Sequence, residues 1–294
     1  MKQKIFITGA TGFIGTYLIR KINIKEYDIT CLVRKFSDKS EFRKCKQIIG
    51  DIKDINSFSD HLKGIGIVIH LAASLGTTDK KIIRETNLTG TKNLIEASIK
   101  NKVKHFIQLS STVAYVKTKG YYGITKLEAD NLLKNSNLNY TILIPGFVYG
   151  RESRFLNKIL QLQKLPIVPL IGNCKIQTIF IEDLIDAILS TINNKNTYNK
   201  SYFTLSEEKI YLKNIYKEIQ KKLDIKKMII PIPRFLALFI LHFINIFSNK
   251  IKFAKEGINQ FYQDYNFDIT SAKNDLKFNP LSFSEGLKKI PISK

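Results

Sequence analysis

The chain has 294 residues, 44% of them hydrophobic and 24% charged, so it is long enough to bury a sizeable core. Its net charge of +22 is high, but the lysines are spread along the chain without a basic block interleaved with aromatic residues. This pattern argues against a nucleic-acid partner. Its three cysteines, Cys31, Cys45 and Cys174, lack metal-type spacing, so we expect no metal site and a reducing, cytoplasmic setting.

The first predicted element is a buried strand that begins at Ile5 and runs into a glycine-rich turn. Gly9, Gly12 and Gly15 are spaced G-x-x-G-x-x-G, and an apolar helical pattern continues from Ile14. Such glycines permit a sharp reversal, a close approach of backbone N–H groups to a pyrophosphate, and tight helix–sheet packing. The segment predicts a dinucleotide site, with a turn that binds nothing as the alternative. The expected contacts are Gly9, Thr11, Gly12, Phe13, Ile14 and Gly15.

The second predicted strand, residues 27–34, bears on the choice of cofactor. Its carboxyl end would meet the adenosine ribose, where a carboxylate suits the 2′-hydroxyl of NAD and an arginine suits the 2′-phosphate of NADP. The chain has Arg34 and Lys35 there and no carboxylate before Asp38. NADP is therefore favoured, while NAD and a surface role for Arg34 stay open.

Strands and helices continue to alternate along the first half of the chain. Further strands are predicted at 47–51, 66–73, 103–109 and 140–144, and helices at 86–100 and 121–133. This alternation predicts an α/β fold with a Rossmann-type, doubly wound parallel sheet. His70 falls inside an apolar run, and we expect it to be a core histidine rather than a catalytic one.

Beyond residue 150 the pattern changes. We expect an NAD(P)-binding Rossmann domain at 1–150 and a smaller, mostly helical substrate-binding lobe at 151–294, with one late sheet strand near 176–181. Residues 235–247 are strongly apolar but shorter than the roughly 20 residues that a membrane span requires. A helix buried in the second lobe is the favoured interpretation. Peripheral contact with a membrane or a partner is the alternative.

Tyr122 and Lys126 are the strongest catalytic candidates. Their spacing of four places both on one face of the predicted helix. A tyrosine is a poor base at neutral pH, and a nearby ammonium favours the phenolate and lowers the tyrosine pKa. The pair follows a Ser-Ser-Thr at the end of a central strand, where Thr112 or Ser111 would hold a substrate oxygen. These groups predict hydride transfer to or from a dinucleotide, with Tyr122 moving the proton.

Several motifs occur together in chain order. They are Thr8–Gly15, Gly50–Asp51, His70–Ala73, Asn87–Thr91, Ser110–Thr112, Tyr122–Lys126 and Pro145–Gly150. Over nearly its whole length the chain therefore resembles the extended short-chain dehydrogenases/reductases of the NAD-dependent epimerase/dehydratase family.

The resemblance implies roles for individual residues. Tyr122 would be the acid/base, Lys126 its electrostatic partner and a ligand of the cofactor ribose, and Thr112 the hydroxyl that orients the substrate. Asp51 would reach the adenine. Further implied cofactor contacts are Ile52, Leu71, Ala72, Ala73, Asn87, Pro145 and Val148.

Two departures from the family pattern bear on the substrate. Many members carry an arginine where this chain has Ile144, and sugar-nucleotide epimerases often carry one in the region that is here residues 176–180. Arg151, Arg154 or a nearby lysine would have to substitute for them in binding a diphosphate.

Three functions stay open. The favoured one is an NAD(P)-dependent epimerase, dehydratase or reductase of a nucleotide-linked sugar. The second is an NADPH-dependent ketone or aldehyde reductase that resembles dihydroflavonol reductases or hydroxysteroid dehydrogenases. The third is a non-catalytic dinucleotide-binding subunit that docks through residues 235–247. The expected partner is a small-molecule substrate, and a homodimer stays open.

Overall fold

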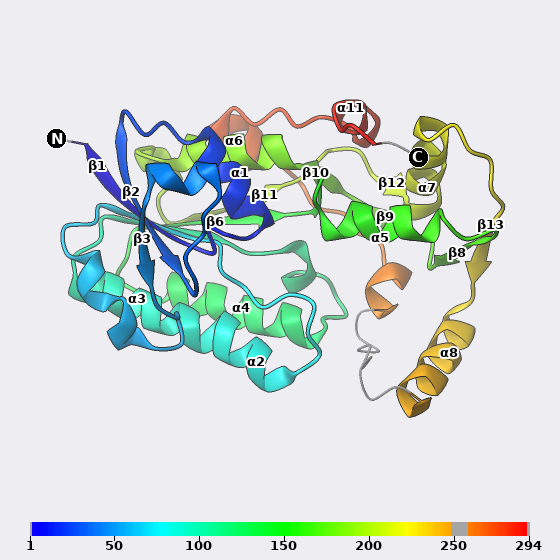
Figure 1. Cartoon of the computed structure of the whole chain (residues 1–294), viewed down its shortest axis with the longest axis horizontal. Helices are drawn as coiled ribbons and strands as arrows, with labels where there is room; N and C mark the ends of the chain where they lie inside the picture. The colour runs from blue at the N-terminus through cyan, green and yellow to red at the C-terminus, as the bar shows by residue number, and fades with distance from the viewer. Residues whose placement is uncertain (1, 248–257, 293–294) are drawn as a thin grey trace.

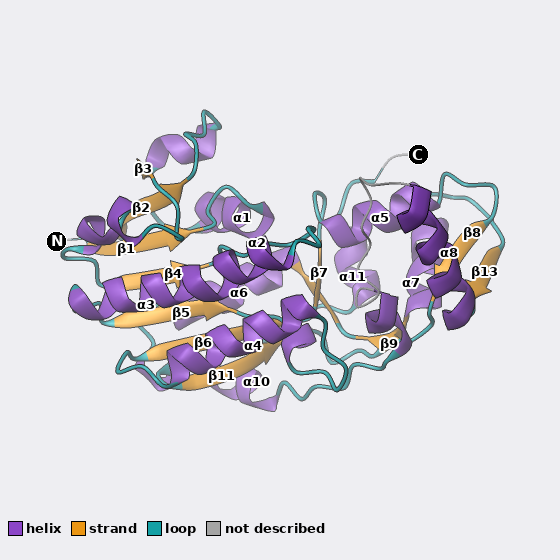
Figure 2. Ribbon diagram, turned by 90° about the horizontal axis from the view of Figure 1, so that it is seen from below, coloured by secondary structure: helices purple, strands orange, loops and turns teal. Residues whose placement is uncertain are grey.

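The computed structural model describes residues 2–247 and 258–292. It contains a parallel sheet with helices on both faces and, beside it, a second lobe built from short strands and helices (Figures 1 and 2). The seven strands of the sheet are β1 (Gln3–Thr8), β2 (Tyr27–Val33), β3 (Lys46–Ile49), β4 (Ile67–His70), β5 (His105–Leu109), β6 (Tyr140–Pro145) and β11 (Lys200–Thr204).

The order of the strands is that of a doubly wound fold. They run β11-β6-β5-β4-β1-β2-β3, and every neighbouring pair is parallel. The winding reverses between β1 and β4, and ligands bind at such a switch point, beyond the carboxyl ends of the strands. The predicted Rossmann-type sheet is confirmed.

Alternate side chains of each strand are buried on opposite faces of the sheet. In β1, Ile5 and Ile7 join the core cluster under α1 (Phe13–Lys21) and α6 (Ile181–Thr191). Phe6 points the other way, into the cluster under α3 (Gly90–Lys100) and α4 (Tyr121–Lys134). Because successive side chains point to opposite faces, a run that is apolar throughout is what a doubly covered strand needs.

The second lobe is held by three two-stranded pairings. They are β7 (Phe147–Tyr149) with β10 (Thr178–Phe180), β9 (Lys175–Ile176) with β12 (Ile210–Tyr211), and β8 (Val168–Ile171) with β13 (Ile229–Ile232). Its helices are α5 (Arg154–Leu162), α7 (Leu212–Lys222), α8 (Arg234–Phe247) and α11 (Phe283–Lys288), while α10 (Thr270–Leu276) packs near β11 and α6. The lobe that contains the sheet thus includes β11 and α6, both of which lie beyond residue 150.

Two predictions for this lobe are wrong. The single strand expected near 176–181 is divided at Gln177 into β9 and β10, which belong to different pairs. The helix expected to be buried at 235–247 forms as α8, but Phe235 and Phe239 are 75% and 59% exposed. Apolar periodicity predicted the helix correctly. It could not reveal that no other described element covers this face.

The helix expected at 86–100 begins earlier than the sequence pattern indicates. It starts with α2 (Lys80–Arg84), whose N-terminus is capped by the Asp79 carboxylate accepting from the N–H groups of Lys81 and Ile82. A π-helical turn over Glu85–Thr89 then connects α2 to α3. Such turns are often found at functional sites.

Candidate functional site

The glycine-rich turn connects β1 to the N-terminus of α1. Gly9 has φ +71°, and a Cβ there would lie 2.5 Å from the backbone nitrogen of Ala72. Only glycine fits both the left-handed backbone and this approach. The N–H of Leu71 donates to the carbonyl of Thr8 (3.1 Å), so the turn is fixed against the segment after β4. The predicted contact segment Leu71–Ala73 is thereby brought beside the turn.

The N-terminus of α1, which follows this turn, is suited to bind a phosphate. Gly12 is the N-cap of α1 and is exposed together with Thr11, while Phe13 and Ile14 are half-buried. The first N–H groups of a helix have no intrahelical acceptor and carry a partial positive charge. Gly15 is buried, and a Cβ there would lie 2.3 Å from the carbonyl oxygen of Gly9, so α1 can start this close to the turn only with glycine at that position.

His70 is a core residue, as expected. It is 1% exposed, its Nδ1 lies 2.7 Å from the hydroxyl of Thr8, and its Nε2 lies 2.9 Å from the hydroxyl of Thr91. Burial, helped by the charge of Lys126, lowers the pKa of His70 to about 3. The ring therefore stays neutral at physiological pH and connects β1, β4 and α3.

Asn87 lies in the π-helical turn and is 1% exposed. Its Oδ1 accepts from the N–H of Ser74 (2.8 Å), and its Nδ2 donates to the hydroxyl of Thr125 (3.2 Å). The side chain thus ties the loop after β4 to α4. The oxygen and the nitrogen of its amide thus both stabilise the backbone segments around the expected cofactor site.

The expected adenosine end lies at the tips of β2 and β3. The N–H of Gly50 donates to the carbonyl of Val33 (3.0 Å), which brings Arg34 and Asp51 to neighbouring strand ends. Arg34 is exposed, and no hydrogen bond or ion pair is recorded for it within the described residues. Asp51 accepts from the N–H of Lys53 (2.9 Å), and Ile52 next to it is buried.

The catalytic candidates lie on α4, beside the tip of β5. Lys126 is 2% exposed, and its Nζ donates to the carbonyl of Leu109 (2.7 Å). Burial lowers the pKa of Lys126, and the carboxylate of Asp130 opposes that shift. Burial and the same carboxylate raise the pKa of Tyr122 to about 12. The lowering that we expected from Lys126 is therefore absent in this structure, because desolvation dominates.

Asp130 is the residue that the sequence analysis missed. It is fully buried and accepts hydrogen bonds from Gln108 Nε2 (2.5 Å), Ser110 Oγ and Tyr115 OH (2.8 Å). Burial and this carboxylate also raise the pKa of Tyr115. The signal was present in the sequence, since Asp130 lies four residues after Lys126 and eight after Tyr122, on the same helix face.

The two candidate hydroxyls differ in access. Thr112 is 2% exposed within a short 3₁₀ turn (Thr112–Ala114), whereas Ser111, just before it, is half-buried. The turn packs tightly on α4, because a Cβ at Gly123 would lie 2.3 Å from the carbonyl oxygen of Val113. The start of α4, which carries Tyr122, therefore packs against the turn that follows Ser111, and Ser111 is the more accessible of the two residues.

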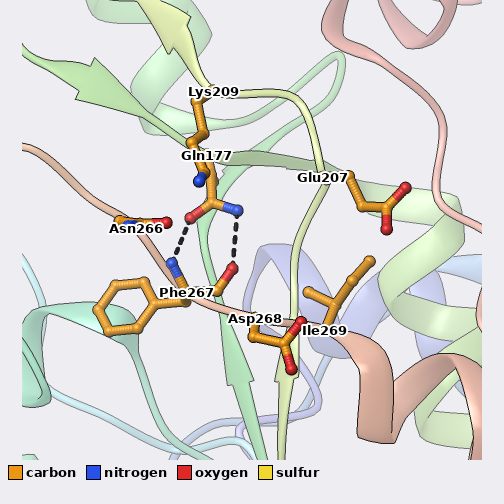
Figure 3. Close-up of a pocket in the computed structure, with 7 residues that line it drawn as sticks. All are labelled: Gln177, Glu207, Lys209, Asn266, Phe267, Asp268 and Ile269. Atoms are coloured by element: carbon orange, nitrogen blue, oxygen red, sulfur yellow. Dashed lines mark hydrogen bonds between the residues drawn. The ribbon is translucent and has the colours of Figure 1, made fainter.

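The region expected to hold a substrate-binding arginine has Gln177 instead. Its Oε1 accepts from the N–H of Phe267 (2.8 Å), while its Nε2 donates to the carbonyls of Phe267 and Ser206 (3.1 Å each). Figure 3 shows the two hydrogen bonds between Gln177 and Phe267, in the wall of a pocket of about 210 Å³. The pocket is lined by Gln177, Glu207, Lys209, Asn266, Phe267, Asp268 and Ile269. Since Gln177 is occupied by backbone groups and the lining carries mixed charge, the pocket is a poor diphosphate site.

The remaining predicted positions lie at the end of β6 and in β7. Pro145 is buried and pairs with Thr204, and Val148 is half-buried and pairs with Ile179. Arg154, a suggested substitute for the missing arginines, donates from Nη1 to the carbonyl of Leu75. It therefore connects α5 of the second lobe to the loop after β4.

Comparison with known proteins agrees with this arrangement. A model of the NAD dependent epimerase/dehydratase family matches residues 5–202. The UDP-glucose 4-epimerase of Vibrio cholerae is 27% identical over 268 residues, which cover 79% of this chain and 80% of that protein. The mitochondrial NADH dehydrogenase 1 alpha subcomplex subunit 9 of Dictyostelium discoideum is 25% identical over 88% of this chain and 75% of that protein.

A solved structure shares the fold along the whole chain. The UDP-glucuronic acid 4-epimerase of Bacillus cereus, in complex with NAD, superposes with a TM-score of 0.76. The alignment covers 98% of this chain and 97% of that one, at 21% sequence identity. At this identity the likeness concerns the fold.

Proposed function

This chain belongs to the NAD dependent epimerase/dehydratase family, and we propose that it is an NAD(P)-dependent enzyme that acts on a nucleotide-linked sugar as an epimerase, dehydratase or reductase. The observation that carries the proposal is the gathering of Ser111, Tyr122 and Lys126 at the carboxyl edge of the sheet, where the glycine turn also lies. A relative of similar length, the Vibrio cholerae enzyme, bears the name of such an activity.

The residues at the glycine turn fit a dinucleotide. A Cβ at Gly9 or Gly15 would fill the space that keeps the turn tight, and the exposed Gly12 leaves the helix N-terminus open to a pyrophosphate. Arg34 is exposed at the ribose end without a neighbouring acidic residue in sequence, which supports NADP over NAD. When bound, the nicotinamide supplies the group that accepts and returns a hydride.

The chain itself supplies proton transfer and orientation. Ser111 or Thr112 would hold the oxygen of the reacting carbon, and the phenol oxygen of Tyr122 would take up or return its proton. Lys126 would bind the cofactor ribose, and its hydrogen bond to the carbonyl of Leu109 fixes its position. The carboxylate of Asp130 opposes the lowering of the Lys126 pKa that burial causes.

A second function is favoured by one observation. Gln177 occupies the region where an arginine would face the substrate diphosphate, and Arg154 is engaged by the carbonyl of Leu75. A substrate without a diphosphate, such as a ketone or aldehyde reduced by NADPH, removes the need for these arginines. The chain is also similar to an NADH dehydrogenase subunit. A third function, that of a non-catalytic dinucleotide-binding subunit, is therefore tested as well.

One assay of the purified protein distinguishes these functions. Retained cofactor is released and identified, and the protein is then incubated with UDP-sugars with and without added NADPH. Conversion of a UDP-sugar to its epimer without net cofactor consumption is the result expected for an epimerase. Oxidation of NADPH with a carbonyl substrate identifies a reductase. Bound cofactor with no turnover of either kind contradicts the proposal and identifies a binding subunit.

A further inference from the structure

One end of the second lobe carries large apolar side chains that face outward. Figure 2 shows β8, β13 and α8 together at this end of the molecule. Phe235 on α8 is 75% exposed, Met228 before β13 is 67% exposed, and Ile167 before β8 is 50% exposed. Ile230, Phe239 and Ile240 extend this surface, with exposures of 38%, 59% and 44%. We call these six residues the apolar end; clusters of this kind mark interaction sites.

The exposed side of α8 is set by its sequence. Phe235 and Phe239 are four residues apart, a spacing that places both on one stripe of the helix. Both are exposed, whereas Ala237, on the other side, is 5% exposed. The N–H of Ala237 donates to the carbonyl of Pro233 (3.0 Å), so the helix forms directly after β13. The aromatic stripe therefore faces away from the lobe.

The segments that build the apolar end carry basic residues and no acidic ones. Residues 153–181, which include α5 and β8, contain no aspartate or glutamate, and neither do residues 225–247, which include β13 and α8. Exposed cations near the apolar side chains include Lys164, Lys226 and Arg234. An apolar surface whose own segments add only positive charge complements a partner that is itself apolar and negatively charged.

We propose that the apolar end docks on an anionic lipid bilayer, with α8 lying in the plane of the interface and its phenylalanine stripe inserted among the acyl chains. The 14 residues of α8 extend about 21 Å, less than the hydrocarbon thickness of a bilayer. In the part of the chain described here, no helix meets the length and hydropathy that a membrane crossing requires. The helix therefore lies on the membrane surface, which is the alternative that the sequence left open.

A second copy of the chain fits this surface less well than lipid does. In a symmetric dimer each patch meets the same patch. The exposed cations Lys164, Lys226 and Arg234 of both copies would then share one interface, and neither of the two segments supplies a carboxylate to neutralise them. Anionic headgroups remove this repulsion at the flanks, while the acyl chains cover the phenylalanines.

The docking proposal is tested by vesicle sedimentation of the full-length protein. Vesicles of phosphatidylcholine alone are compared with vesicles that also contain phosphatidylglycerol, at low and high salt. We expect binding to the anionic vesicles that weakens as salt rises. Combined Phe235→Ser and Phe239→Ser substitutions should weaken binding about tenfold or more. Lys226→Glu should weaken it about fivefold on anionic vesicles.

Two matched controls lie on the sheet lobe. Ile99→Ser removes a 44% exposed apolar side chain from the end of α3, and Lys63→Glu reverses an exposed lysine before β4. Both should bind vesicles like the unchanged protein. The proposal is overturned by no vesicle binding, by equal binding to neutral and anionic vesicles, or by a lipid-independent dimer that the phenylalanine substitutions dissociate. The Lys226→Glu variant keeps the test valid should the phenylalanine variant fold poorly. The readout is independent of enzyme activity, so it can fail while the proposed function stands.

Discussion

Lys126 and Asp130 are buried one turn apart on the same face of α4, and the carboxylate is the charge that opposes loss of the proton from the lysine. Tyr122 lies one turn further along this face, and its pKa is raised by the same carboxylate. One buried negative charge thus acts on both proposed catalytic groups. It opposes the lowering of the lysine pKa by burial and makes the tyrosine harder to ionise.

Replacement of Asp130 by asparagine should shift the pH profile while the fold is kept. Gln108 Oε1 has no partner among the described residues, so after rotation of its amide it can accept from the new Asn Nδ2. Ser110 and Tyr115 keep an acceptor oxygen. Without the negative charge the pKa values of Tyr122 and Lys126 both fall, so we expect the rise of activity with pH to move to lower pH.

The control for this variant lies on the exposed side of the same helix. Glu128→Gln removes a carboxylate that pairs with Arg84 (3.1 Å) at the surface and should leave the profile unchanged. Asp130→Ala should instead lower the free energy of unfolding by about 3 kcal/mol, since it leaves buried donors unpaired. An unshifted profile in the asparagine variant contradicts the electrostatic role of Asp130.

The substrate-orienting hydroxyl can be assigned by two single substitutions. Because Ser111 is half-buried and Thr112 is almost fully buried, we expect Ser111→Ala to lower kcat about 100-fold or more, as loss of a transition-state contact does. Thr112→Val, which keeps the shape, should lower kcat less than tenfold. Steady-state kinetics of both variants decide between the hydroxyls, and the reverse order assigns the role to Thr112.

Arg34 determines the choice of cofactor if it meets the 2′-phosphate. Arg34→Ala should weaken NADP binding about tenfold or more and leave NAD binding nearly unchanged, because only NADP offers a charged partner there. Titration calorimetry with each dinucleotide measures both affinities. Arg20→Ala, which removes an exposed arginine that pairs with Glu41 (3.1 Å), should affect neither. An equal loss for NAD and NADP excludes the phosphate contact.

His70 should make the protein less stable as the pH falls. Its pKa is about 3 in the folded chain against about 6.5 when exposed, so below pH 6.5 the unfolded chain binds a proton that the folded chain does not. The stability is complete above pH 6.5 and is lost progressively down to about pH 3. At pH 5 the loss is about 2 kcal/mol relative to pH 7.

Urea unfolding at pH 7 and pH 5 measures this contribution. His70→Asn should be less stable than the unchanged protein at pH 7, because its contacts with Thr8 and Thr91 are altered. Its stability should nevertheless change less between the two pH values. An unchanged pH dependence would show that His70 is not the group responsible, and His105, whose pKa is lowered to about 4 by burial, would be the next candidate.

The sheet and the site could be predicted because each depends on local sequence. A short apolar run such as Ile5–Thr8 is typical of a strand that is covered on both faces. Parallel strands bring their carboxyl ends to one edge of the sheet. The sequence therefore predicts that Gly9 and Tyr122 lie at the same edge of the sheet. Spacing alone also placed Lys126 on the face of Tyr122.

The features that sequence could not reveal depend on what lies opposite a residue. Hydropathy predicted α8, but its exposure depends on the absence of a covering element among the described residues. The pKa of Tyr122 is raised by its burial and by the carboxylate of Asp130, while Lys126 donates to the carbonyl of Leu109. The sequence pattern predicts Gln177 within a strand, but its side-chain amide hydrogen-bonds the backbone of Phe267, which lies far along the chain.

The most direct test of the account is the activity of Tyr122→Phe, which removes the phenol oxygen and keeps the ring. With the substrate that the unchanged enzyme turns over, the variant should retain its cofactor and lose 100- to 10,000-fold in kcat, the range of general acid–base catalysis. Tyr121→Phe, the matched change at the neighbouring tyrosine, should stay within about threefold because that residue has no catalytic role in the account. Unchanged activity in Tyr122→Phe, with cofactor still bound, would contradict the proposed chemistry.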